Sequence, residues 1–362
     1  MRAGCWGRSV LLIAALWCGS LSTSRSAERS HLEHATEALQ LLLARYPEAL
    51  HVYRDGHDFH AWQRFVVVSS LAEYEAISGE SRFRRRAASL LSDRRGLDGN
   101  DDDLWVAEAA LDVATVQGRR PAAGSPVVAD ARHIFDRIAA SYWDGICGGG
   151  VWWDHARTYK NAITNELFMD VAARLYAATG TSLYRAWALK SWVWFHDSGM
   201  INPSFSVNDG LDARCHNNGG PAYSYNQGVI LDGLLHLAAI SPADDLLPEA
   251  ARIGEAAIAA RGSSADGFRE AQEPMSVDSR IFRGIFVRAL GHLVPALPDG
   301  GEKGRLAAWL SGESARLWDR RHGRALFSAD WRQASFTPSA QAQVTAADLF
   351  MAAARAAGEE RP

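Results

Sequence analysis

Ala72-Glu-Tyr-Glu-Ala-Ile-Ser-Gly-Glu-Ser-Arg-Phe83 ends one apolar helical segment and opens the next. About 100 residues later, Ala172-Ala-Arg-Leu-Tyr-Ala-Ala-Thr-Gly-Thr-Ser-Leu183 repeats the pattern. In both stretches a Gly follows the apolar run, as is typical of a helix C-cap, and Phe or Leu begins the following helix. The two units predict helical hairpins of roughly 50 residues each.

The same pattern extends in both directions along the chain, and alternating strand patterns are scarce. The sequence predicts helices at 62–77, 83–91, 106–116, 127–138, 165–179, 183–198, 227–240, 247–260, 281–293, 306–318 and 341–357. So many hairpins form either an open solenoid or a closed ring. Because no polar terminal cap is evident, we expect an all-α fold in which the hairpins close into a toroid.

The first 27 residues resemble an export signal. Arg2 and Arg8 precede the apolar run 10–17, and small residues lead to a plausible cleavage site near Ala27. This run is too short to span a bilayer. A lipoprotein signal at Cys18 is the less favoured alternative, because the bulky Trp17 precedes it. We therefore expect a signal peptide at 1–27, a single domain at 28–362 without an internal linker, and a secreted or periplasmic location.

Composition narrows the possible partners. The apolar fraction of 48% and charged fraction of 22% are typical of a globular chain with a large core. Removing residues 1–27, which hold three Arg and no acidic residue, takes the formal charge from −4 to −7. This acidity argues against nucleic acid or an anionic membrane as a partner. No later segment is long and apolar enough to cross a membrane.

The cysteines and histidines give no sign of a metal site, and no cofactor is expected. Cys147 and Cys215 remain after export and can either pair or stay as free thiols; an oxidising compartment favours the disulfide. The histidines lack the His-Glu-x-x-His spacing of a zinc site. We interpret them, His155, His196 and His216 included, as structural or cleft-lining.

Three interhelical stretches, 145–161, 200–224 and 263–279, are long for a compact domain. They are rich in Trp, Tyr, Asn, Asp and Gly, and Trp152 and Trp153 stand side by side. Aromatic rings pack against apolar sugar faces, while Asp, Asn and Gln bond to hydroxyls. The loops therefore indicate a carbohydrate cleft.

Asp101-Asp102-Asp103-Leu104-Trp105 places three consecutive acids before an aromatic residue and an apolar helix. The run can be an acidic helix start, because Asp favours that position. It can also be a pair of carboxyls with separated pKa values, which glycosidic bond cleavage requires.

Several motifs together resemble glycoside hydrolase family 76. They are Asp101 to Ala107, Cys147 to Trp153 with Tyr159 to Asn165, Tyr223 to Val229, Asp278 to Phe286 and Gln341 to Met351. Arg283 stands where the family usually has Lys. The motifs occur in order over almost the whole chain after residue 60.

The resemblance implies an (α/α)6 toroid and an endo-acting α-1,6-mannanase that retains the anomeric configuration. It also implies that Asp101 and Asp102 are the catalytic pair and that the partner is a polysaccharide or oligosaccharide, α-mannan. A signal peptide without a C-terminal lipid-anchor tail makes the chain look more like the soluble bacterial branch of the family than like the fungal relatives, for which the resemblance implies cell-wall crosslinking. Alternatives on the same toroid are a transglycosidase, an epimerase and an inactive glycan-binding protein.

In the expected mechanism Asp101 attacks the anomeric carbon, and Asp102 protonates the leaving oxygen and then activates water. Neighbouring helical residues diverge by about 100°, so we expect the pair on an irregular turn before the helix. Ionised Asp101 should raise the pKa of Asp102. Asp103 is interpreted as an N-cap or a support for the pair, and a catalytic role for it is the less favoured alternative.

The remaining candidates are expected to bind sugar, although each also has an ordinary structural explanation as a core, turn or capping residue. They are Trp105, Trp152, Trp153, Lys160, Asn161, Asn165, Asp209, Tyr225, Asn226 and Gln227. Asp58 and Trp62 are weaker candidates.

Overall fold

The computed structural model describes Met1 and residues 30–47, 59–117, 123–241, 245–263, 267–332 and 336–360. The predicted signal segment beyond Met1 and the candidate Asp58 lie outside the described residues.

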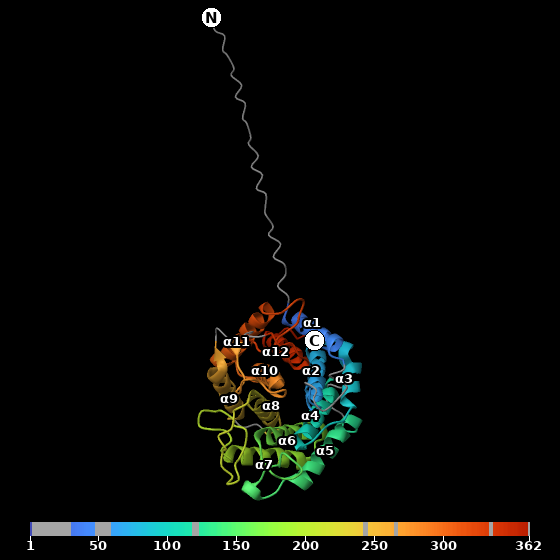
Figure 1. Ribbon diagram of the computed structural model, residues 1–362, viewed down its shortest axis with the longest axis vertical. Helices are drawn as coiled ribbons and strands as arrows, with labels where there is room; N and C mark the ends of the chain where they lie inside the picture. Colours follow the sequence, from blue (N-terminus) through green and yellow to red (C-terminus); the bar gives the residue numbers. More distant parts are fainter. Residues whose placement is uncertain are drawn as a thin grey trace.

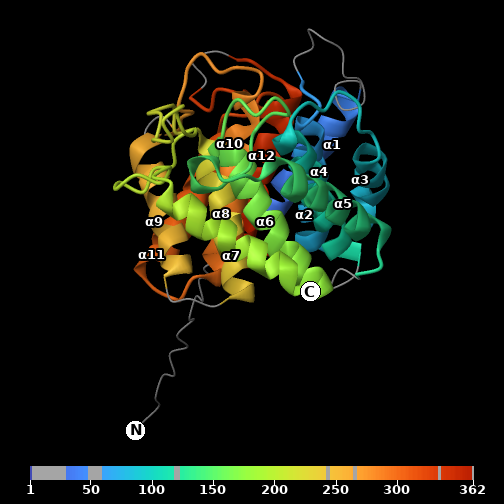
Figure 2. The ribbon, with the colours of Figure 1, turned by 90° about the horizontal axis from the view of Figure 1, so that it is seen from below.

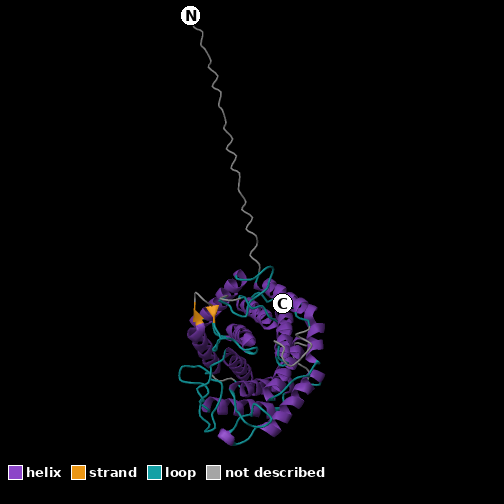
Figure 3. Cartoon of the chain, viewed as in Figure 1, coloured by secondary structure: helices purple, strands orange, loops and turns teal. Residues whose placement is uncertain are grey.

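The described residues form twelve α-helices with very little strand (Figure 3). The helices are α1 (His31–Arg45), α2 (Gln63–Ser78), α3 (Arg84–Leu91), α4 (Asn100–Gln117), α5 (Pro126–Tyr142), α6 (Ala162–Thr179), α7 (Ser182–Asp197), α8 (Ser224–Ile240), α9 (Leu246–Arg261), α10 (Ser279–Ala296), α11 (Gly301–Asp319) and α12 (Ala340–Ala356). Two single 3-10 turns, Ser81–Phe83 and Ile146–Gly148, and an antiparallel pair, β1 (Gly262–Ser263) with β2 (Gly267–Phe268), complete the elements.

The helices form two concentric rings (Figure 1). In the inner ring α2, α4, α6, α8, α10 and α12 each pack on the next, and α12 packs on α2 to close the circle. The other six helices lie outside them; α5, for example, contacts both α4 and α6. This arrangement confirms the predicted (α/α)6 toroid.

Burial explains which helices lie inside. Every residue of α12 from Ala340 to Ala354 is buried, because this helix is enclosed on all sides. The outer helix α5 buries only one stripe, Val128, Ala131, Ile134, Phe135 and Ile138. Inner helices also approach one another closely at glycines: a Cβ on Gly228 of α8 would lie 2.7 Å from the Phe286 backbone of α10.

Helix α1 was absent from the sequence prediction, which began at residue 62. Ser30 and Glu33 form a capping box at its start, and the buried stripe that follows includes Leu32, Leu39 and Leu42. Helix α1 packs on α12 and supplies the twelfth helix that six pairs require. The Ser-x-x-Glu signature was the sequence signal for this helix.

Side-chain hydrogen bonds cross the seam where the ring closes. Ser70 Oγ of α2 donates to Asp348 Oδ1 of α12 over 2.6 Å, although the two residues are 278 positions apart. Gln341 Nε2 donates to Gln63 Oε1 over 3.1 Å. The seam therefore joins the first and last inner helices by specific polar contacts in addition to apolar packing.

The loops before the inner helices gather at one end of the ring (Figure 2). Two of them, 145–161 and 200–224, are joined by a disulfide between Cys147 and Cys215, which confirms the favoured prediction. No described helix is long and apolar enough to cross a membrane.

Candidate active site

A cleft of about 370 Å³ opens at the N-terminal ends of five inner helices. Its walls come from segments far apart in the sequence. They are His60, Ala61, Trp62, Gly96, Asp98, Asp101, Asp102, Trp105, Trp153, Tyr159, Asn161, Asp209, Tyr225, Asp278 and Phe282.

Asp101 and Asp102 both line this cleft, but they belong to the first turn of α4. The expectation that they lie on an irregular turn before the helix is wrong. Helix α4 begins at Asn100, the residue before the pair. The Asn100 backbone N–H donates to Trp153 O and the Asn100 side-chain amide donates to Trp152 O, each over 2.8 Å, and these bonds fix the start of the helix. The left-handed turn needed just before is made by Gly99, whose φ is 127°.

Burial governs the protonation of the pair. It raises the pKa of Asp101 to about 7, which the indole N–H of Trp153 and nearby backbone N–H groups oppose. Burial followed by the neighbouring Asp101 charge raises the pKa of Asp102 to about 8. Asp102 Oδ2 accepts the Asp98 N–H over 2.8 Å, whereas Asp101 Oδ1 has no hydrogen-bond partner among the described residues. Both carboxyls therefore hold a proton more tightly than an exposed aspartate does.

Asp103 has a different environment from its neighbours. It accepts a hydrogen bond of 2.6 Å from Arg137 Nη2 of α5 and does not line the cleft. Because α4 already begins at Asn100, Asp103 is not the N-cap. Its ion pair instead joins the first turn of α4 to the outer ring.

Asp278 supplies a third carboxyl to the cleft, and the sequence prediction did not include it among the site residues. Its Oδ1 accepts from His60 Nδ1 over 2.7 Å and from Trp62 Nε1 over 2.9 Å. Its charge also contributes to the raised pKa values of Asp101 and Asp102. Asp278 begins the motif that runs to Phe286, which was the available signal, whereas nothing in the sequence marked His60.

Aromatic rings form much of the cleft surface. Trp105 stacks on Trp62 with centroids 5.5 Å apart. Tyr225 lies parallel to Phe282 at 3.8 Å. Trp153 leaves 39% of its surface exposed. This surface offers flat apolar faces beside the carboxyls, as a sugar ring requires.

A short polar chain forms the opposite wall. Tyr159 OH donates to Asp209 Oδ2 over 2.8 Å and accepts from Asn218 Nδ2 over 2.7 Å. Burial raises the pKa of Asp209, while this hydroxyl and the buried Asn226 oppose the rise. Asn161 lines the cleft as the N-cap of α6.

Two predicted sugar contacts belong instead to the support of the wall. Lys160 is 2% exposed, and its Nζ donates to Asp144 Oδ1 over 2.8 Å and to the carbonyls of Ile146 and Gly149. Trp152 Nε1 donates to the other oxygen of Asp144 over 2.7 Å. Neither side chain lines the cleft, because both are engaged in holding the loop 145–161.

Asn165, Asn226 and Gln227 also lie behind the cleft surface. Asn165 pairs with the backbone of Val151 through both its Oδ1 and its Nδ2, and Gln227 does the same with Val207. Asn165 and Gln227 therefore hold the two long loops on α6 and α8, and a direct sugar contact has no support in their geometry. Asn226 is fully buried and acts on the carboxyl of Asp209.

The three histidines singled out from the sequence do not line the cleft. His155 stacks on Tyr142, His196 lies beside Asp197, and His216 is on the exposed disulfide-bearing loop. Within the described ranges no three His, Cys, Asp or Glu side chains are grouped to hold a metal ion.

The fold and the site define the class of this protein, the (α/α)6 toroid glycosidases. They combine a double ring of helices with a carboxyl-lined aromatic cleft at the N-terminal ends of the inner helices. The sequence profile of glycosyl hydrolase family 76 matches residues 51–361. The chain belongs to this family.

Similar proteins include the mannan endo-1,6-alpha-mannosidase DCW1 of Saccharomyces cerevisiae, which is 29% identical over 229 residues, 59% of this chain and 50% of that protein. The chain thus spans about half the length of the curated relatives that it matches.

Among solved structures, the Lin0763 protein of Listeria innocua aligns with a TM-score of 0.78 and 20% identity over 92% of this chain and 99% of that one. The alpha-1,6-mannanase GH76A of Salegentibacter sp. HEL1_6 aligns with a TM-score of 0.76 and 20% identity over 90% and 99%. That structure is an inactive variant, with two consecutive aspartates replaced by alanine, in complex with alpha-1,6-mannotetrose.

Proposed function

We propose that this protein is a secreted endo-acting mannanase that cleaves α-1,6-mannosidic linkages with retention of configuration. The observation that carries the proposal is the placement of Asp101 and Asp102 side by side on the rim of an aromatic cleft. Family membership and the printed activities of the relatives support the substrate class. The loss of activity in a relative that lacks two consecutive aspartates supports the pair as its catalytic groups.

In the proposed first step the ionised carboxylate of Asp101 attacks the anomeric carbon. Asp102 gives its proton to the departing glycosidic oxygen, so that the sugar–oxygen bond breaks as the bond to Asp101 forms. In the second step the Asp102 carboxylate takes a proton from water, and the resulting hydroxide displaces Asp101 from the anomeric carbon. The pair is then restored with its proton on Asp102.

The cleft walls suggest how the sugar is held for this attack. Trp153 and Trp62, which stacks on the buried Trp105, offer apolar faces, and Asp209 and Asp278 offer carboxylate oxygens to sugar hydroxyls. Of the residues predicted from the sequence, we propose Trp105, Trp153, Asn161, Asp209 and Tyr225 as substrate-binding.

Release of reducing ends from linear α-1,6-mannan tests the activity. We expect turnover in the wild type, none in Asp101→Asn or Asp102→Asn, and near wild-type turnover in Asp103→Asn, which keeps the same helix turn but alters a residue outside the cleft. Turnover in either of the first two variants would refute the assignment. NMR of the first product formed should show the α anomer; early β anomer would establish inversion, and longer products would establish sugar transfer.

We also propose that residues 1–27 are a signal peptide and that the mature chain works in the periplasm or outside the cell. The Cys147–Cys215 disulfide supports this location, because such bonds persist in oxidising compartments. Intact mass and N-terminal sequencing of exported protein test the cleavage site near Ala27. A lipid on Cys18 would instead establish the lipoprotein alternative.

A further inference from the structure

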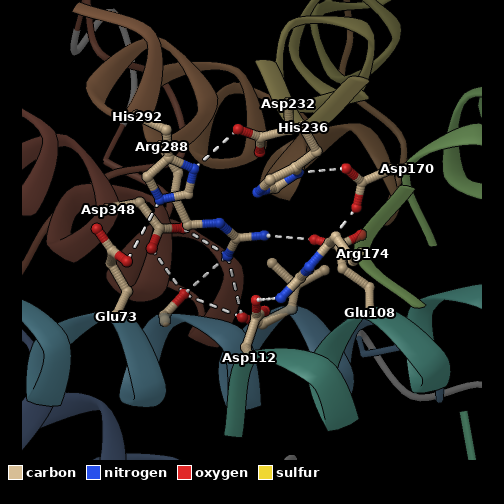
Figure 4. A network of polar contacts seen from close by, with 12 residues as sticks. Glu73, Glu108, Asp112, Asp170, Arg174, Asp232, His236, Arg288, His292 and Asp348 are labelled. Atoms are coloured by element: carbon tan, nitrogen blue, oxygen red, sulfur yellow. Dashed lines mark hydrogen bonds and ion pairs between the residues drawn. The ribbon is translucent and has the colours of Figure 1, made fainter. Parts of the chain in front are cut away.

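A second cavity, of about 810 Å³, lies at the C-terminal ends of the inner helices, opposite the cleft. Side chains from all six inner helices converge in this region (Figure 4). The proposed reaction does not use these groups.

The cations around this cavity already have carboxylate partners. Arg174 Nη2 donates to Asp112 over 2.5 Å. His292 lies between Asp232, 2.8 Å from its Nδ1, and Glu73, 3.3 Å from its Nε2. The two carboxylates hold this histidine charged by raising its pKa to about 10 against the effect of burial. A ligand that brings negative charge would therefore compete with partners already in place.

The carboxyls outnumber the cations. The cluster holds six carboxyls and five basic groups. The carboxyls are those of Glu73, Glu108, Asp112, Asp170, Asp232 and Asp348, and the basic groups are those of Arg174, His236, Arg288, His292 and Arg355. Glu108 and Asp348 share Arg288, whose nitrogens lie 3.6 Å and 3.9 Å from their carboxyl oxygens. Two carboxyls thus lack a close cation of their own.

Of the two carboxyls, Glu108 is the one that lines the cavity, and one of its oxygens has no hydrogen-bond partner among the described residues. Glu108 is 7% exposed, and the unpartnered oxygen is Oε2. Ser69 on the neighbouring helix α2 is 2% exposed, also lines the cavity, and has an equally unpartnered Oγ. Buried polar atoms without a hydrogen-bond partner are costly, and a ligand that bonds to both atoms would remove this cost.

The surroundings of Glu108 favour positive charge. Burial raises the pKa of Glu108 well above its ordinary value, Asp112 and Asp170 raise it further, and Arg288 and Arg174 oppose the rise. Glu73, Asp232, His236, His292 and Asp348 are the other titratable groups of the cluster. The C-terminal ends of the inner helices add partial negative charge at this end of the ring.

We propose that this cavity binds an organic cation with a primary ammonium group, whose N–H donors meet Glu108 Oε2 and Ser69 Oγ. An ammonium group supplies both the donors and the positive charge that the cluster lacks. A neutral polyol supplies only the donors. A bare metal ion lacks its ligands, because the described residues hold no group of three metal-binding side chains.

Calorimetric titration of the intact protein with cadaverine, a linear diammonium compound, tests the site. We expect binding to the wild type and at least about tenfold weaker binding to Glu108→Gln, which keeps the shape of a protonated Glu. Because the cleft is also acidic, the Asp101→Asn/Asp102→Asn double variant is the matched control and should bind as the wild type does. Equal binding by Glu108→Gln, or lost binding in the cleft variant, would overturn the proposal.

Two further probes distinguish an ammonium ligand from a neutral polyol and from a metal cation. A third measurement tests the proposal on the wild-type protein alone. Pentane-1,5-diol and potassium chloride should bind at least about tenfold more weakly than cadaverine; equal binding of either would overturn the ammonium assignment. Titration in buffers of different ionisation enthalpy should show proton release, because Glu108 must ionise to pair with the ligand. No binding, or binding without proton release, would also overturn the proposal.

Discussion

Replacing Asp102 by Asn should abolish turnover and, at alkaline pH, stabilise the fold. Burial and Asp101 raise the pKa of Asp102 from its ordinary value of 3.8 to about 8. The folded protein therefore holds this proton more tightly than the unfolded chain does. The contribution of Asp102 to stability is complete below about pH 4 and is lost as the pH rises toward 8.

The size of the effect follows from this interval. Each pH unit within it costs about 1.4 kcal/mol, so the wild type should lose about 4 kcal/mol relative to Asp102→Asn between pH 5 and pH 8. At about 2 cal/mol/K of unfolding entropy per residue, this loss corresponds to about 5 °C in the melting temperature. Asn carries no titrating proton, so the variant avoids the loss.

Scanning calorimetry of both proteins at pH 5 and pH 8 measures the difference. Asp103→Asn is the matched control, one residue away on the same turn. It removes a partly exposed ion pair with Arg137 and should lose up to about 1 kcal/mol at either pH. If Asp102→Asn melts no later than the wild type at pH 8, Asp102 does not carry the buried proton that the mechanism requires.

Three more predictions concern the cleft and its walls. Asp278→Asn should move the alkaline limit of activity to lower pH, because it removes a charge that raises the pKa values of the pair; a pH–rate profile with an unchanged limit would contradict this. Replacing Cys147 and Cys215 by Ser opens a loop with a sequence separation of 68, which should cost about 4 kcal/mol in calorimetry and raise KM; unchanged melting and KM would show the bond to be dispensable. Lys160→Met leaves Asp144 without its buried partner and should lower the free energy of unfolding by about 3 kcal/mol. If the lysine only supports the loop, the melting temperature should fall while kcat stays close to the wild-type value. A loss of kcat with an unchanged melting temperature would indicate a sugar contact.

The helical ring could be predicted because its pattern is local. Apolar runs that end in Gly79, Gly180 or Gly199 mark helices regardless of what packs on them. Helix α1 carries an equally local signal, the capping box of Ser30 and Glu33, although the apolar pattern alone does not mark it. The start of α4 was misplaced because Asn100 is held by the distant carbonyls of Trp152 and Trp153, a tertiary contact that no local pattern contains.

The cleft could be predicted only in part for the same reason. Asp101 and Trp105 are marked by their neighbours in sequence. Asp278 and His60 are 218 positions apart in the sequence, and they lie in one site only because the helices fold into a ring. Lys160 illustrates the opposite error, because a lysine near a cleft serves equally well to bind a ligand or to hold a loop, and only its bonds to backbone carbonyls decide which.

The seam between α2 and α12 has a consequence for synthesis of the protein. During translation the first inner helix emerges long before its neighbour across the seam, which is 278 positions away at the Ser70–Asp348 bond. Until α12 is synthesised, the inner helices form an incomplete ring that leaves apolar helix surface uncovered at each of its two ends. Folding of the circle is therefore necessarily completed after elongation of the last hairpin, and the unfinished arc is the stage at which a chaperone would be needed.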